Sequence, residues 1–551
     1  MVRTSLSSPE PLEGQESERV EWELQYFRTH FDGLLADLGG ALNEVLGQQK
    51  SIAFWRILVG PWLHHFVLFV LAQLRPNSMV ATTLPRRRVA ASGEDFAAST
   101  MTENYAQLVA ADAAQSPVSQ SAGQRDDRLA TTRAPKWQRR LKAVMKAIHW
   151  CAQGILLHKA MVIVREGYFP QSTEINIWWL SRGRIRFDRR DYGLDPDALI
   201  VDQRRRTALA ARLQHATTEP GATIRRLIPL HLPRIYLEGF DSLGRYADRM
   251  FREPAAAYFT CNAHWYDEVF KHQVARSRES GARLLIGQHG GNHGIVETLL
   301  PEEFERGIAD RFCTWGWRED DRTIPMPAPK LMGLFWRRRA GTEAEILFTA
   351  TAAVTVDSGV DPSHPYAKSR SKDYLAWQIR FLTALSPPLR CGLRFRTLWD
   401  WAGDFWKPLL KAFPEVLIEN AYECGVPFRE RLAACRLYVC DHLSTTYAEA
   451  LAANKPTLLF WDPEITRVRS AAQPFIDALH ACGILHFNPE SAAREVSKAY
   501  ADVHAWWSDP GKQKAVQDFR DRYLLTDKNS SKSWAKFLIG EAGSNVGESK
   551  A

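Results

Sequence analysis

Residues 438–462, YVCDHLSTTYAEALAANKPTLLFWD, contain two apolar runs with a polar turn and a helix-forming segment between them. The runs YVC and TLLFW carry no charge, which is typical of strands that are buried on both faces of a sheet. The segment TYAEALAAN places its apolar residues at helical spacing. A strand, a helix and a second strand in this order form a unit with parallel strands, so this stretch predicts an α/β fold.

The same alternation extends through the rest of the C-terminal half, where short loops separate the elements. We expect strands at 345–351, 389–397, 415–420, 436–441, 456–462 and 484–488, and helices at 372–386, 404–413, 427–435, 446–454, 473–483 and 489–507. Regular alternation with near-continuous apolar strands indicates a parallel sheet that helices cover on both faces. It predicts a Rossmann-like domain.

The N-terminal half alternates less regularly, and its strand order cannot be read from the pattern. The basic segment FWRRRAG at 335–341 suits a linker, so we expect two Rossmann-like domains that face a cleft. The expected parts are an N-terminal α/β domain at 1–335 with a helical N-terminal part, a flexible insertion at 76–135 and a basic helix at 136–164; a C-terminal Rossmann-like domain at 341–525; and a C-terminal helix and tail at 526–551.

The composition leaves room for two or three domains with cores, since the chain has 551 residues of which 45% are hydrophobic. A net charge of +8 favours an anionic partner such as a nucleotide, a phospholipid surface or a polyanionic glycan; a solvated basic surface is the alternative. No nucleic-acid partner is expected, because the aromatic residues alternate with apolar residues and not with Lys or Arg. Eight cysteines without a CxxC pair indicate reduced thiols in a cytoplasmic protein.

The most apolar stretch is FWRILVGPWLHHFVLFVLAQL at 54–74. It contains Arg56, Gly60 and Pro61, which count against a membrane-spanning helix. We predict a buried helical segment, with an interfacial membrane anchor as the alternative. The polar, acidic start of the chain is no signal peptide, so we expect a cytoplasmic protein with room for peripheral contact with the inner membrane.

The segment IGQHGGNHG at 286–294 directly follows the predicted strand ARLLIG. Ligands of parallel α/β sheets collect beyond the carboxyl ends of strands, and glycines let them approach the backbone. His289 is therefore the candidate for proton transfer, with Gln288 and Asn292 orienting hydroxyls. Gly290 and Gly291 would contact the substrate. The alternative is a tight turn with His289 hydrogen-bonded to a carbonyl.

The polar turn in 438–462 is the second candidate site. Ser444, Thr445 and Thr446 offer hydroxyls, and free N–H groups at the start of the following helix bind phosphate. Glu449, one turn later, could hold a ribose diol, although Thr446 and Glu449 also match a capping box. Asp441, at the strand end, could orient the turn or meet the ligand.

Charged residues elsewhere leave more alternatives open. Arg394 and Arg396 lie on one face of a predicted strand, where phosphate binding and a structural ion pair are both open. Glu238 follows the apolar run LPRIYL and is our candidate for a catalytic carboxylate, with a loop acid or helix cap as the alternative. No acidic pair makes a convincing metal site, so we expect no metal and no cofactor besides the donor substrate.

Five segments together resemble the bacterial surface-carbohydrate biosynthesis transferases: FWRILVGPWLHHFV, LPRIYLEGF, GQHGGNHG, DRFCTWGW and CDHLSTTYAEALAANKPTLLFWD. That family is similar to GT-B glycosyltransferases and, distantly, to Kdo and polyol-phosphate transferases. The resemblance implies a nucleotide-activated sugar bound by the C-terminal half and a glycan or lipid-linked acceptor toward the N-terminal half. A polyol-phosphate transferase, or a non-catalytic nucleotide-binding scaffold of a surface-glycan assembly, is the alternative.

Overall fold

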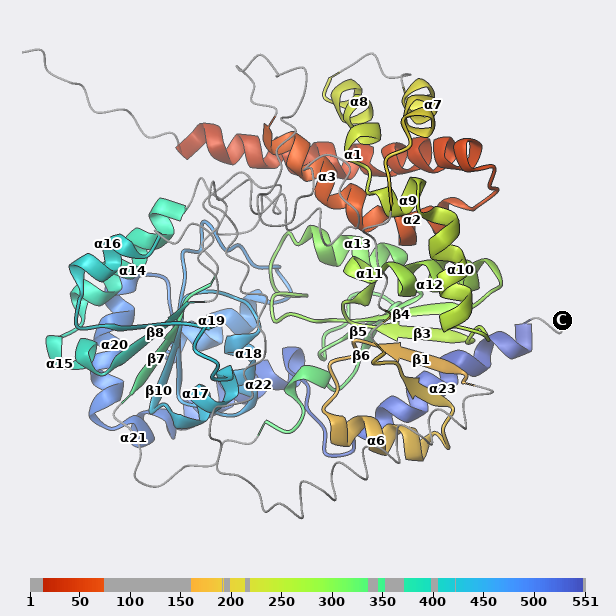
Figure 1. The fold of residues 1–551 in the computed structure, drawn as a ribbon. Coiled ribbons are helices and arrows are strands. Elements are labelled where there is room, and N and C mark those ends of the chain that lie inside the picture. The colour runs from red at the N-terminus through yellow and green to blue at the C-terminus, as the bar shows by residue number, and fades with distance from the viewer. Residues whose placement is uncertain are drawn as a thin grey trace, which may run out of the picture.

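The computed structural model describes residues 13–73, 160–190, 192, 199–213, 219–334, 345–351, 371–397, 405–421 and 423–548. These residues form two lobes, each built on a six-stranded parallel sheet (Figure 1). The predicted α/β class with two Rossmann-like domains is thereby confirmed. The expected insertion at 76–135 and the whole of the expected linker at 335–341 lie outside the described residues.

The C-terminal sheet follows the predicted elements closely. Its strands are β7 (Ile346–Thr349), β8 (Leu393–Thr397), β9 (Leu417–Asn420), β10 (Leu437–Cys440), β11 (Thr457–Phe460) and β12 (Leu485–His486), in the spatial order β12-β11-β10-β7-β8-β9. Every residue of β7, β10 and β11 is buried, as expected for strands covered on both faces. The strand order reverses between β7 and β10, and ligands of open α/β sheets bind at this switch point.

Helices flank this sheet: α14 (Ser371–Ala384), α15 (Pro387–Cys391), α16 (Lys407–Ala412), α17 (Phe428–Ala434), α18 (Thr446–Ala452), α19 (Gln473–Ala481), α20 (Pro489–Ala501), α21 (Val503–Trp507) and α22 (Pro510–Tyr523). α14 and α20 lie on one side of the sheet and α17 and α18 on the other (Figure 1). The strand expected at 389–397 begins later, at Leu393, because Pro387 starts the short helix α15 there.

The N-terminal sheet has the order β2-β1-β3-β4-β5-β6 and is also parallel. Its strands are β1 (Val162–Arg165), β2 (Ile185–Phe187), β3 (Ala257–Thr260), β4 (Arg283–Gly287), β5 (Arg311–Thr314) and β6 (Thr323–Pro325). β1 corrects the helix expected at 136–164, because its β-branched residues VIV pair with two neighbouring strands. The rest of that expected helix, up to residue 159, lies outside the described residues.

The helices of this domain are α6 (Gln171–Leu180), α9 (Arg234–Leu237), α10 (Phe240–Met250), α11 (Ala263–Tyr266), α12 (Glu268–Glu279) and α13 (Leu300–Ile308), with a short 3-10 turn, η2 (Pro329–Leu331). A helical cap stacks above them (Figure 1). It consists of α1 (Glu13–Leu46), α2 (Ile52–Leu58), α3 (Gly60–Gln73), α7 (Gln203–Leu213) and α8 (Gly221–His231).

The apolar stretch at 54–74 is a core segment of this cap. Trp55, Trp62 and Phe66 are at most 1% exposed. The predicted burial is confirmed, and it contradicts the interfacial-anchor alternative, since these side chains already pack inside the domain. Within the described part of the chain, no single helix is long and apolar enough to cross a membrane. Helix α2 and residues Gly60–Leu71 meet these two criteria only when taken together, and this pair is bent by 69°.

The chain returns to the N-terminal lobe at its end. After α22, the helix α23 (Ser530–Glu548) packs on α6 and on the N-terminal sheet. Trp534 and Leu538 are buried in the same apolar cluster as residues of β1 and β3, and Trp534 Nε1 donates to the carbonyl of Pro327 at 2.8 Å. The chain therefore crosses between the two lobes again between α22 and α23, and the packing of α23 holds this end of the chain on the N-terminal lobe.

Candidate active site

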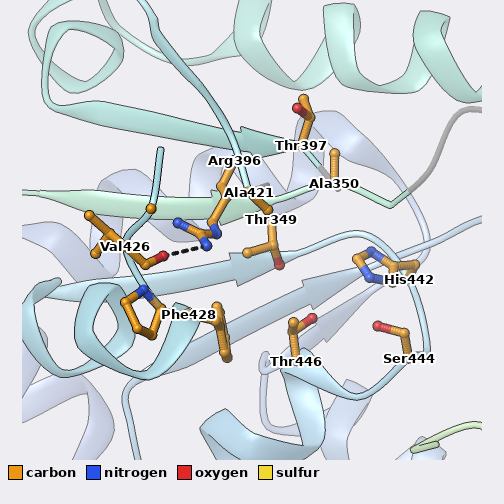
Figure 2. Close-up of a pocket in the computed structure, with 12 residues that line it drawn as sticks. Thr349, Ala350, Arg396, Thr397, Ala421, Val426, Phe428, His442, Ser444 and Thr446 are labelled. Carbon is orange, nitrogen blue, oxygen red and sulfur yellow. Dashed lines mark hydrogen bonds between the residues drawn. The ribbon is translucent and has the colours of Figure 1, made fainter. Parts of the chain in front are cut away.

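A cavity of about 440 Å³ lies at the carboxyl ends of the C-terminal strands, at the switch point between β7 and β10. The polar residues around it are Thr349, Arg396, Thr397, His442, Ser444 and Thr446 (Figure 2). They come from the ends of β7 and β8 and from the loop after β10. The volume suits a small-molecule ligand of nucleotide size.

His442 lines this cavity from the loop after β10. Its Nδ1 lies 2.8 Å from Asp441 Oδ1 and 3.5 Å from the sulfur of Cys440. Burial acts to lower the pKa of His442, but Cys440 and Asp441 outweigh it and raise the pKa to about 10. Asp441 also accepts from Tyr374 at 3.1 Å and Gln378 at 2.7 Å, so it orients the turn. His442 is therefore held in its protonated form beside the cavity, by two neighbours whose negative charge offsets its own.

The polar turn contributes hydroxyls to the same cavity. Ser444 and Thr446 belong to its lining, whereas Thr445 does not. Figure 2 shows the side chains of Ser444 and Thr446 near that of His442. A cation and two hydroxyls in this arrangement can hold an anionic oxygen such as that of a phosphate.

Glu449 lies outside this cavity. It is 7% exposed, its Oε1 lies 3.4 Å from Arg429, and it interacts electrostatically with Lys330 of the N-terminal domain. Burial raises the pKa of Glu449 in spite of these cations. The expected capping box is not formed, because Thr445 is the N-cap of α18 and makes no side-chain cap bond. Glu449 thus belongs to an ion cluster between the domains, and the cavity offers no support for its predicted ribose contact.

The two arginines of β8 have different surroundings, and only one of them lines the cavity. Arg394 bonds Glu345 at 2.8 and 3.0 Å and Glu419 at 3.1 Å, and it does not line the cavity. Arg396 lines the cavity, but its guanidinium pairs with Glu419 and donates to the carbonyl of Val426 at 2.8 Å (Figure 2). The structural ion pair therefore accounts for Arg394, while Arg396 is held in place at the cavity wall.

The glycine-histidine loop packs directly against the polar turn. Tyr447 of α18 donates from its hydroxyl to the carbonyl of Gly291 at 2.6 Å. A Cβ atom at Gly291 would lie 2.0 Å from the carbonyl oxygen of Ser444. Glycine at this position lets the backbones of two domains meet, which is a different close approach from the predicted one to a ligand. The two candidate segments of the sequence are thus in direct contact, although no residue of 286–294 lines the cavity itself.

Gln288 holds the loop together and is not free to read a substrate. Its Oε1 accepts from the backbone N–H of Trp315 at 2.9 Å and from Trp317 Nε1 at 2.8 Å. Its Nε2 donates to the carbonyl of Gly290 at 2.7 Å. Because Gln288 is 2% exposed and its amide is bonded within the protein, the structure gives its predicted role as a substrate-binding residue no support.

The buried carboxylate of Glu305 lies beneath the loop, and several side-chain nitrogen atoms surround it. Oε1 of Glu305, on α13, accepts from Trp265 Nε1 at 2.8 Å and lies 3.2 Å from His264 Nε2; Oε2 lies 3.2 Å from His293 Nε2. Burial acts to raise the pKa of Glu305, but the imidazoles outweigh it and hold the pKa well below its usual range. Asn292 Oδ1 lies 3.1 Å from the other nitrogen of His293, so Asn292 orients this ring instead of the predicted hydroxyl.

His289 is the exposed member of this cluster. Its side chain is 28% exposed, against 1% for His264 and 2% for His293, and its Nδ1 lies 3.4 Å from Glu305 Oε1. Desolvation lowers the pKa of His289 to about 3, although Glu305 acts to raise it. His289 is therefore neutral near pH 7, which leaves a ring nitrogen free to accept a proton, although so low a pKa makes the ring a weak proton acceptor. The donor atoms of His289, His293 and Glu305 also lie within 4.8 Å of one another, a spacing that could hold a metal ion.

Glu238 lies in a buried ion pair with Arg206. Its two carboxylate oxygens accept from Arg206 Nε and Nη2, both at 2.8 Å, and one of them also accepts from the backbone of Asp202 at 3.1 Å. Glu238 and Arg206 are each 5% exposed. Both oxygens are occupied in a buried ion pair that ties α9 to α7, so the structure gives the predicted catalytic role of Glu238 no support.

A family model described as LIC12162 family transferase matches residues 8–538. This match covers nearly the whole chain. The chain belongs to the LIC12162 family of transferases. The resemblance to a transferase family and the prediction of an enzyme are thereby confirmed. Among curated proteins, none matches significantly.

Several solved structures are similar to this transferase at low sequence identity. They include a trehalose-phosphate synthase from Burkholderia xenovorans with glucose-6-phosphate (11% identity, 69% of this chain and 99% of that chain, TM-score 0.34), the S. aureus MnaA–UDP structure (8%, 70% and 97%, 0.37) and the spinosyn rhamnosyltransferase SpnG (12%, 66% and 95%, 0.31). We draw no functional conclusion from similarities at these scores.

Two residues of the candidate site, His442 and Glu305, were not predicted from the sequence. His442 stands inside the turn motif, directly after the strand, and its position at a strand end was a usable signal. Glu305 is one of several acids in the helix LPEEFERGI, and no spacing distinguishes it from Glu302 or Glu303. Its role becomes visible only when the fold brings three imidazoles to it.

Proposed function

We propose that this transferase is a glycosyltransferase that moves a sugar from a nucleotide-activated donor to a hydroxyl of a glycan or lipid-linked acceptor. The observation that carries the proposal is the convergence of His442, Ser444 and Thr446 on one cavity at a switch point. A cation with two hydroxyls suits the phosphates of a nucleoside diphosphate, and the position suits a nucleotide.

The proposed reaction breaks the bond between the anomeric carbon and the phosphate oxygen and forms a bond from that carbon to the acceptor oxygen. Negative charge develops on the leaving phosphate, where the His442 cation stabilises it. The acceptor hydroxyl loses its proton to His289, the proposed base. The contact between Gly291 and Ser444 supports these two roles, because it places the loop that carries the proposed base against the turn that carries the proposed phosphate contacts.

A thermal-shift series with CMP, CDP, UDP, GDP and dTDP tests donor binding, since a ligand that binds the folded state raises the melting temperature. We expect one of these nucleotides to raise it in the wild type and to fail in His442→Gln. Release of that nucleotide from the matching nucleotide sugars then tests transfer. Consumption of a CDP-polyol but of no nucleotide sugar would favour the polyol-phosphate alternative, and binding without any turnover would favour a scaffold.

We also propose that the enzyme is cytoplasmic and associates with an anionic membrane surface. The end of α6 and the turn that follows it support this: Trp179 is 68% and Leu180 50% exposed, and Arg182 and Arg184 after them are exposed as well. Exposed apolar side chains beside arginines suit an interface of acyl chains and anionic headgroups.

Co-sedimentation with vesicles, prepared with and without phosphatidylglycerol, tests the membrane proposal. We expect binding only to the anionic vesicles, release at high salt because screening weakens the attraction, and weaker binding of Trp179→Ser. Equal binding of the wild type to both kinds of vesicle, or none to either, would contradict it.

A further inference from the structure

We propose that Glu305 is a positioning residue that holds His289 in the orientation of a base. The inference rests on the proposed function, in which His289 takes the proton of the acceptor hydroxyl. It begins from a buried carboxylate that lies beneath the loop of the base, with nitrogen atoms of three imidazoles within 3.4 Å of its oxygens.

The first step concerns why this carboxylate is fixed. Glu305 is fully buried, and a buried charge is costly unless hydrogen bonds satisfy it. Trp265 Nε1 at 2.8 Å and the Nε2 atoms of His264 and His293 at 3.2 Å supply these bonds from three directions. The side chains of Trp265, His264 and His293, which contact the carboxylate, are themselves at most 4% exposed. The carboxylate therefore has a fixed position that does not depend on His289.

The second step concerns what is left for His289. Its Nδ1 is buried and forms no hydrogen bond among the described residues, yet it lies 3.4 Å from Glu305 Oε1. Catalytic hydrogen bonds are often long in the absence of substrate and shorten in the complex. A proton on Nδ1 directed at this oxygen leaves the lone pair on Nε2, which is the nitrogen that a hydroxyl must meet.

The third step is the proton balance. The hydroxyl proton moves to Nε2 of His289, and the acceptor oxygen keeps the electron pair with which it forms the new bond. The resulting imidazolium donates from Nδ1 to Glu305, which stays ionised throughout. The carboxylate thus fixes the tautomer of the base and stabilises the cation that the reaction creates, without touching the substrate.

Diethyl pyrocarbonate tests this inference without any donor, because it acylates the neutral nitrogen of an accessible imidazole. The full chain is treated with EDTA, dialysed and reacted, and modification of His289 is followed by peptide mass mapping. Nδ1–H donation to a carboxylate makes Nε2 more nucleophilic, so we expect slower modification of His289 in Glu305→Gln than in the wild type. A loosened loop would give the opposite sign, since it would expose His289 and speed its modification.

Two further variants keep the test sharp. Glu302→Gln removes the charge of another fully buried carboxylate of α13, which pairs with Arg469 at 3.0 Å and accepts from the backbone N–H of Gly294 at 2.8 Å, but contacts no imidazole. Because the amide oxygen of Gln can still accept from Gly294, we expect modification of His289 close to the wild-type rate. Glu305→Asp keeps the buried charge but is one methylene shorter, and we expect slower modification in this variant too. Wild-type or faster modification of His289 in both Glu305 variants would overturn the inference. Release of a stoichiometric metal by EDTA would also overturn it, because the cluster would then be a metal site.

Turnover separates this inference from the proposed function. In the His289→Ala background, we expect Glu305→Gln to cause no further loss of turnover, because a positioning residue acts only through the base. In the wild-type background we expect roughly a hundredfold loss. If the turnover losses of Glu305→Gln and His289→Ala multiply in the double variant, the positioning role of Glu305 is wrong, while the proposed function is unaffected. A His289→Ala variant with wild-type turnover would instead remove the base from the proposed function.

Discussion

His442 carries a positive charge because of its immediate neighbours, and this charge has a pH dependence that can be measured. Its pKa is raised to about 10, so the cation is present below that pH and is lost as the pH rises through it. We expect the affinity for the nucleotide identified by thermal shift to be level from neutral pH to about 9 and to fall above that.

Isothermal titration calorimetry across this range checks the expectation. In His442→Gln the affinity at neutral pH should fall by about 1.5 to 3 kcal/mol, the usual contribution of a hydrogen bond to a charged group, and its decline at high pH should disappear. Thr445→Val is the matched control, because Thr445 neighbours the turn residues but does not line the cavity. A loss of affinity between pH 6 and 7 would show that another group controls binding.

His289 invites a second residue-scale prediction. His289→Ala should lower turnover by roughly a hundredfold, the usual contribution of a general base, with little change in melting temperature, since the ring is 28% exposed. His264→Ala should instead destabilise the protein, because its ring is 1% exposed and bonded to Glu305. We expect the free energy of unfolding to fall by about 1 to 3 kcal/mol. Early unfolding of His289→Ala with full specific activity would make its loop purely structural.

The residue types of the loop could be predicted as a site, but not the partners of each residue. Gln288 and Asn292 look alike in sequence as polar groups on a glycine-rich loop, yet both are used inside the protein. Asn292 contacts its neighbour His293, whereas the oxygen of Gln288 accepts from Trp315 and Trp317, which follow the neighbouring strand β5. Sequence spacing gives no distance between such segments, so the division between supporting and reacting residues had to come from the structure.

At the scale of elements, the ion pair of Glu238 with Arg206 links α9 of the N-terminal domain to α7 of the helical cap. Removing one partner of a buried pair leaves an uncompensated charge, so Glu238→Gln should lower the stability of the cap by about 3 to 5 kcal/mol. Urea unfolding followed by tryptophan fluorescence measures this. Asp241→Asn, an exposed acid nearby in sequence, is the control and should stay within about 0.5 kcal/mol. Loss of turnover in Glu238→Gln at full stability would restore its predicted catalytic role.

The two sheets differ in how far the sequence could predict them. In the C-terminal sheet, single helices separate short apolar strands, and the resulting alternation identified each strand. In the N-terminal sheet, β1 follows a segment with helical character, and only its pairing with β2 and β3 makes it a strand. Strand order there depends on contacts across the chain, which local patterns do not contain.

At the scale of the whole molecule, the two lobes meet through backbone as well as side chains. Val296 and Val468 form an antiparallel bridge between the loop after β4 and the segment after β11. Arg469 pairs with the buried Glu302 at 3.0 Å and donates to the carbonyl of Val296 at the same distance. The proposed base and the phosphate turn therefore sit on either side of a specific, directional interface, and its geometry should control activity.

Gly291 is where that control can be tested. Gly291→Ala places a methyl group 2.0 Å from the Ser444 carbonyl, and because this obstacle is backbone of the other domain, no rotamer relieves it. We expect a cost in stability of about 1 to 3 kcal/mol and at least a tenfold loss of turnover, because the base and the phosphate turn move apart. Gly290→Ala is the matched control: its methyl meets the side-chain oxygen of Asn292 at 2.7 Å, within the same loop, and that side chain can turn away. Melting curves and nucleotide release measured on both variants decide the matter, since equal behaviour of the two would mean that the contact between the domains has no part in transfer.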